Sequence, residues 1–136
     1  MRSDQRKIMN QVNASFELGL TEIEYEYSRF DAKNGSYVVE IKDRNTFYKE
    51  TLIEFDKYAF NKEYAKLNNK EFLYVIGMNN EIYLFNISDL DNNGFNYHWH
   101  WKKMPRHTEF DDKEDIYKFV GYIDTERVVG RISLDD

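Results

Sequence analysis

The chain has 136 residues, 25 acidic and 19 basic side chains, a net charge of −6 and no cysteine. This length predicts one domain over residues 1–136. The lack of cysteine excludes a disulfide scaffold, a thiolate zinc site and a cysteine nucleophile. The acidic balance disfavours a nucleic-acid partner, because neutralising phosphates usually requires a basic face.

No run of the sequence approaches the roughly 20 apolar residues of a membrane span. The N-terminal residues also lack the apolar segment of a signal peptide. We therefore expect a cytoplasmic protein without a membrane partner, in the host cytoplasm if the chain is phage-encoded.

The first elements follow from apolar spacing and turn residues. Apolar side chains four apart predict a helix over 4–19, with Gly19 as its C-cap. Two runs rich in Tyr, Val and Ile, at 22–33 and 36–44, flank Asn34-Gly35, which predicts a β-hairpin with a two-residue turn.

The rest of the chain predicts one more helix and several strands. The helix is expected over 46–69, where Tyr48, Leu52 and Phe55 form one stripe. Asn79-Asn80 is predicted to be a turn and 88–95 a polar loop. Strands are predicted at 71–78, 81–87, 97–103, 116–123 and 127–132. The order indicates an α/β (α+β) fold, with a mixed central sheet and flanking helices.

The hairpin carries the most informative residues. With a two-residue turn, Asp31 opposes Val38, and Asp31, Glu40 and Lys42 project from one side. Asp31 and Glu40 become diagonal neighbours, roughly 7 to 8 Å apart at Cα, so that both carboxylates reach one hard cation. The alternative is an ordinary charged surface of ion pairs. The other side, with Phe30, Val39 and Ile41, is predicted to be core.

At these residues the chain resembles the PD-(D/E)XK nuclease superfamily, whose signature is an Asp on one strand and Glu-x-Lys on the next. Here Phe30-Asp31 is the first half of the motif and Glu40-Ile41-Lys42 the second. The Pro that often precedes the Asp is absent. The resemblance implies a restriction-endonuclease-like core of the small phage or resolvase-like type.

The resemblance also implies a site and a reaction. Mg²⁺ (or Mn²⁺) would be held by Asp31, Glu40 and the backbone carbonyl of Ile41, and Lys42 would assist the attacking water. Some members carry a further acid on the first helix, for which Glu17 is the candidate; its alternative is a solvated helix position. The reaction is hydrolysis of a DNA phosphodiester that leaves a 5′-phosphate.

Several basic residues are candidates for nucleic-acid contacts. Lys57 shares a helix face with Glu54 and would reach a phosphate or the attacking water; the alternative is a solvated helix face. Lys102, Lys103 and Arg106 form a local basic patch. Near this patch, an exposed Trp or His of 98–101 would stack on a base. The alternative is that the Trp residues are core and the His residues are solvated.

The sequence therefore predicts a metal-dependent DNA nuclease, phage-encoded or from a mobile element. Because so short a chain cannot enclose a duplex, a homodimer or larger assembly is expected. Two alternatives remain: a catalytically inactive binding or assembly module with the nuclease fold, and an acidic inhibitor of a host nucleic-acid-binding protein.

Overall fold

A computed structural model describes residues 1–25, 28–105 and 115–134. The helices are α1 (Ser3–Phe16), α2 (Phe55–Leu67) and α3 (Ile87–Asn92), with a 3-10 turn η1 (Thr125–Arg127). The strands are β1 (Thr21–Glu22), β2 (Ala32–Lys33), β3 (Tyr37–Arg44), β4 (Glu50–Glu54), β5 (Glu71–Met78), β6 (Glu81–Asn86), β7 (His100–Pro105), β8 (Asp115–Asp124) and β9 (Gly130–Ser133).

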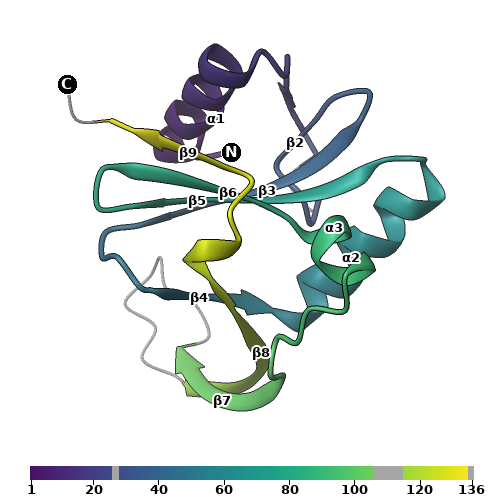
Figure 1. Ribbon diagram of the computed structural model, residues 1–136, viewed down its shortest axis with the longest axis vertical. Coiled ribbons are helices and arrows are strands. Elements are labelled where there is room, and N and C mark those ends of the chain that lie inside the picture. The colour runs from purple at the N-terminus through teal and green to yellow at the C-terminus, as the bar shows by residue number, and fades with distance from the viewer. Residues whose placement is uncertain (26–27, 106–114, 135–136) are drawn as a thin grey trace.

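The described strands form two sheets. The central sheet has the order β1-β2-β3-β5-β6-β9, and a smaller sheet has the order β4-β8-β7. The central sheet is mixed, because β3 and β5 are parallel and the other neighbours are antiparallel. Figure 1 shows α1 over one face of the central sheet, with α2, α3 and the smaller sheet on the other side.

Both faces of the central sheet are buried, so each has its own core. On the α1 side, Ile8 and Val12 pack against Val39 and Ile41. On the other side, α2 and the smaller sheet enclose a larger core that includes Val38, Ile53, Tyr58, Phe72, Tyr74 and Ile123. Because β5 lies within the sheet, burial on both faces explains its nearly continuous apolar sequence.

The fold class predicted from the sequence is confirmed: a mixed central sheet with flanking helices. The predicted strands 71–78 and 116–123 are close to β5 and β8, and Asn79 and Asn80 form the β5–β6 turn, with φ of 49° and 61°. No helix within the described ranges is long and apolar enough to cross a membrane.

The predicted strand 22–33 is wrong, because among its described residues only those of β1 and β2, at its two ends, pair as strands. The predicted register is also wrong by two residues, since Lys33 opposes Val38. Asn34 closes the turn differently from a two-residue hairpin: its side-chain Oδ1 accepts bonds from the backbone N–H groups of Ser36 (2.8 Å) and Tyr37 (2.6 Å).

The helix predicted over 46–69 is wrong in its first part, where β4 lies. Thr51 and Ile53 are buried on alternate positions, and β4 pairs with β8. Tyr48 is exposed, so the supposed helical stripe does not face a core.

The polar loop predicted over 88–95 is also partly wrong. It begins with α3, where the Asn86 side chain accepts a bond from Asp89 N–H as an N-cap.

Candidate functional site

The site begins at the edge of β3, beyond the short strand β2. Ile41 directs its N–H and C=O toward this edge, and neither is bonded to β2. Its N–H donates to Asp31 Oδ2 at 2.7 Å, and its carbonyl accepts from Gln5 Nε2 of α1 at 2.9 Å. The Ile41 backbone therefore fixes the Asp31 carboxylate beside β3 and joins it to the start of α1.

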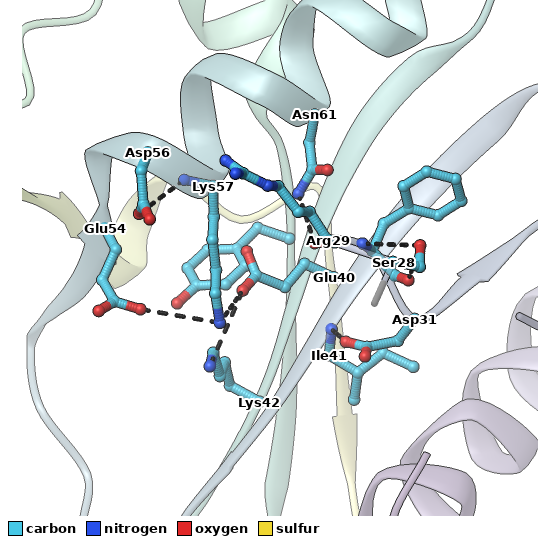
Figure 2. A network of polar contacts seen from close by, with 12 residues as sticks. Ser28, Arg29, Asp31, Glu40, Ile41, Lys42, Glu54, Asp56, Lys57 and Asn61 are labelled. Atoms are coloured by element: carbon cyan, nitrogen blue, oxygen red, sulfur yellow. Dashed lines mark hydrogen bonds and ion pairs between the residues drawn. The ribbon is translucent and has the colours of Figure 1, made fainter. Parts of the chain in front are cut away.

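Glu40 is a buried carboxylate between two ammonium groups. Its side chain is 4% exposed, and its Oε1 lies 3.8 Å from Lys42 Nζ and 3.5 Å from Lys57 Nζ. Figure 2 shows Lys57 reaching down from α2 and Lys42 rising from β3, so that both nitrogens meet the Glu40 carboxylate.

The ion pairs extend from β3 into the smaller sheet. Lys57 Nζ also lies 3.8 Å from Glu54 Oε2, at the junction of β4 and α2. Glu54 in turn pairs with Lys118 of β8 at 2.8 Å. Glu54 is thus neutralised by two lysines, and the network ties the central sheet to the smaller one.

The pKa values of the three acids at this site are not all shifted in the same direction. Desolvation raises the pKa of Glu40 to about 7, although Lys42 and Lys57 oppose the rise. Desolvation also raises the pKa of Asp31, against the bond from Ile41 N–H and the charge of Lys42. Burial acts the same way on Glu54, but the Lys118 hydrogen bond and the Lys57 charge outweigh it and lower its pKa.

The lysines also differ from each other. Burial lowers the pKa of Lys42, and the attraction of Glu40 only partly offsets it. For Lys57 burial acts in the same direction, but Glu40 and the other neighbouring acids outweigh it and its pKa is raised. Lys57 is therefore the more firmly protonated of the two.

Four of these groups, those of Asp31, Glu40, Lys42 and Lys57, line one open depression of about 450 Å³. Its charged lining includes the carboxylates of Asp31 and Glu40 and the cationic groups of Arg29, Lys42 and Lys57. The three residues of the sequence motif, Asp31, Glu40 and Lys42, are thus brought to one place. Two carboxylates and two ammonium groups in one depression provide oxygen ligands for a hard cation and positive charge for an anionic substrate.

The comparisons with known proteins bear on this arrangement of elements. No protein-family model and no curated protein matches the sequence. The fold is similar to that of a Holliday junction resolvase. That protein is Hjc from the archaeal hyperthermophile Archaeoglobus fulgidus, with a TM-score of 0.50 and 11% identity over 93% of this chain and 95% of that chain. At this identity the likeness concerns the fold.

Glu17, the proposed additional acid, is not brought to the site. It is the C-cap of α1, exposed and in the left-handed conformation with φ 54°, where Gly19 was predicted to cap. The start of α1, with Gln5, lines the depression. At 1.5 Å per residue, Glu17 lies about 18 Å further along the helix axis.

The predicted basic patch is only partly described. Lys102 and Lys103 are exposed on β7, in the smaller sheet, and neither lines the depression around Glu40. Lys102 Nζ donates to Tyr122 OH at 3.0 Å. Arg106 lies outside the described residues.

Two residues of the site were not among the sequence candidates. Gln5 is the third residue of α1 and its side-chain oxygen also accepts the Arg2 N–H at 3.0 Å, so a capping position was its only signal. Glu54 was noted only as a neighbour of Lys57. Within 1–25, 28–105 and 115–134, no group of three or more His, Cys, Asp or Glu side chains is placed to hold a metal ion.

Proposed function

We propose that this protein is a metal-dependent nuclease that hydrolyses DNA phosphodiester bonds. The observation that carries the proposal is the convergence of Asp31, Glu40 and Lys42 on one depression of a resolvase-like fold. Their order and spacing match the two half-motifs of the PD-(D/E)XK superfamily. This resemblance is already present in the amino-acid sequence.

The donor set fits a hard divalent cation, Mg²⁺ or Mn²⁺. Asp31 and Glu40 offer carboxylate oxygens, and Ile41 offers a backbone carbonyl that already accepts the Gln5 amide. Because desolvation raises the pKa of Glu40 to about 7, a cation must displace a proton from this carboxyl near neutral pH, and the metal affinity should rise with pH. When bound there, the cation supplies Lewis-acid stabilisation of the charge that develops on the phosphate.

The two lysines have complementary roles in this proposal. Lys57, held protonated by Glu40 and Glu54, stays a fixed positive charge that attracts a substrate phosphate. Lys42, whose pKa burial lowers, orients the attacking water and accepts or returns its proton more readily than an ordinary lysine. In the metal-free protein, both ammonium groups balance Glu40.

Cleavage by a lysine variant tests this assignment. Lys42→Ala is expected to reduce Mg²⁺-dependent cleavage of a labelled DNA by about 10²-fold or more, as for loss of a general acid or base. Lys66→Ala removes an equal charge from the exposed side of α2 and should leave cleavage unchanged. Equal cleavage by both variants refutes the role given to Lys42.

One observation favours a second candidate, a nuclease-fold binding or assembly module without catalysis. Glu40 already pairs with two lysines, and the Ile41 carbonyl already has a donor in Gln5. Such a non-catalytic module shows no rise in melting temperature when metal is added. If the site binds Mn²⁺, the melting temperature of the protein rises with increasing metal concentration. The acidic-inhibitor alternative predicts a host protein partner and no DNA binding.

We further propose that the protein acts as a homodimer or larger assembly on DNA, because one short chain contacts little of a duplex. Sedimentation of the purified protein with and without DNA measures this. A monomer in both conditions contradicts the proposed assembly. The nuclease proposal is unaffected, because cleavage tests it separately.

A further inference from the structure

A second depression lies beside the candidate site, between the start of α2 and the β7–β8 ribbon. Its volume is about 660 Å³, within the usual range for small-ligand sites. Unlike the polar depression around Glu40, it is mostly apolar. Its aromatic and cationic lining consists of Phe55, Trp101, Tyr117, Phe119, Lys57 and Lys118. We call it the aromatic groove.

Strand pairing explains why aromatic rings gather in this groove. Trp101 of β7 opposes Phe119 of β8, and Tyr117 lies two residues from Phe119 on the same face. The Phe119 ring centroid is 5.1 Å from Trp101 and 5.2 Å from Phe55 of α2. Phe55 also packs edge-on against Trp99 at 5.0 Å, which connects the groove to the core.

The outer rings of the groove are open to solvent. Trp101 and Tyr117 are each 67% exposed, although Trp101 is supported from behind by Phe119. A ring held by its neighbours with a free face stacks on a planar ligand at little cost in conformational entropy. The sequence alternative that placed both tryptophans in the core is therefore wrong for Trp101.

The charge of the groove suits a ligand attached to phosphates. Lys57 and Lys118 line it, and Lys103 projects from β7 opposite Tyr117. Two acids also line the groove. Glu54 is paired with Lys57 and Lys118, and Asp56 accepts the Lys57 backbone N–H at 2.8 Å. Both acids are therefore engaged by donors of the protein.

The groove is continuous with the candidate site through one side chain. Lys57 lines both depressions, and its ammonium group lies 3.5 Å from Glu40. A DNA strand whose phosphate lies at Lys57 would therefore have an adjoining nucleotide at the aromatic groove.

We propose that the aromatic groove binds an unstacked nucleobase next to the scissile phosphate, with Trp101 and Tyr117 as the stacking surfaces. This inference rests on the proposed nuclease function and narrows its substrate. A base inside an intact duplex presents no free face, so the preferred substrate is DNA with unpaired nucleotides at the point of cleavage.

Equilibrium binding without metal tests the groove independently of cleavage. The probes are two fluorescein-labelled duplexes, one fully paired and one with a single-stranded thymidine flap, measured by anisotropy in EDTA. Wild type is expected to prefer the flapped duplex. Trp101→Ala should weaken flap binding about 5- to 150-fold, the range for one stacked base, and Trp101→Phe should restore part of it.

Two further variants complete the design. Tyr117→Ala should weaken flap binding in the same way, and it keeps the test valid if Trp101→Ala does not fold. Tyr48→Ala removes another exposed ring, 53% exposed and outside both depressions, and should bind both duplexes as wild type does.

The outcomes separate this inference from the nuclease proposal. One outcome is that flap binding depends on Trp101 but the protein does not cleave DNA with Mg²⁺. This outcome supports base binding in the groove and refutes the nuclease proposal. Cleavage with an unchanged preference for the flap in Trp101→Ala and Tyr117→Ala refutes the groove alone. Dissociation of a dimer by Trp101→Ala in sedimentation, without loss of flap binding, also overturns it and makes the groove an interface between copies.

Discussion

Glu40→Gln is expected to stabilise the metal-free protein in alkaline solution. Glu40 is buried, and desolvation raises its pKa from 4.5 to about 7. A carboxyl with a raised folded-state pKa contributes stability below its unfolded pKa and loses it as pH rises through the folded pKa. The wild-type protein therefore loses stability between pH 4.5 and about 7 through this group. Glutamine resembles the neutral acid in shape and does not ionise, so the variant avoids this loss.

The expected magnitude follows from the two pKa values. At 1.36 kcal/mol for each pKa unit, the difference between 4.5 and about 7 corresponds to ~3 kcal/mol. This free energy already includes the attraction of Lys42 and Lys57, which oppose the rise in the pKa of Glu40. In a chain of this size ~3 kcal/mol corresponds to about 10 °C in Tm.

Urea unfolding in EDTA, followed by tryptophan fluorescence at about pH 4.5 and about pH 8, measures the effect. Glu40→Gln should match wild type at the lower pH and exceed it by ~3 kcal/mol at the higher pH. Glu54→Gln is the matched control with the opposite sign, since Lys118 and Lys57 hold the pKa of Glu54 below its ordinary value. A loss of stability in Glu40→Gln at the higher pH refutes the argument that desolvation dominates at this carboxylate.

Three further predictions concern single side chains. Lys57→Ala should raise the pKa of Glu40 further, because one of its two compensating charges is lost; carbon-detected NMR titration of the carboxyl measures this, and an unchanged pKa contradicts it. Gly121→Ala should destabilise the fold by about 1–3 kcal/mol, because a Cβ there would lie 2.9 Å from the Tyr97 carbonyl oxygen; urea unfolding tests it, and wild-type stability contradicts it. Tyr74→Phe should cost ~1 kcal/mol in the same assay, because the buried hydroxyl donates to the Leu52 carbonyl at 2.9 Å; no cost would show that this bond adds nothing net.

The sequence predicted a turn correctly where the turn depends only on backbone conformation. Asn79 and Asn80 both adopt positive φ, and β5 and β6 follow as the sequence predicts. Asn34-Gly35 carried the stronger hairpin signal, but Asn34 bonds through its side chain to Ser36, Tyr37 and the Leu18 carbonyl. The contact with Leu18 depends on the tertiary fold, which no turn signal contains.

The error over 46–54 has a similar cause. Thr51 and Ile53 alternate in burial over a strand of five residues, too short to be distinguished from a helical stripe by spacing. The strand forms because β8, far along the chain, pairs with it. Contacts of this kind also decide where α2 begins.

The site was predictable in its motif and not in its surroundings. Asp31, Glu40 and Lys42 lie close in sequence around the β2–β3 turn, and they line one depression although the predicted register was wrong by two residues. The positions of Lys57, Glu54 and Gln5 depend on how α1 and α2 pack against β3. That packing is set by the two cores and carries no local sequence signal.

Single-turnover cleavage by Asp31→Ala tests the central claim most directly. The substrate is a labelled flapped duplex with Mg²⁺, and retention of the fold is checked by circular dichroism. Asp31 is anchored by Ile41 N–H and lines the same depression as Glu40. We predict cleavage by wild type that requires Mg²⁺ and is abolished in the folded variant. Undiminished cleavage by Asp31→Ala would contradict the account.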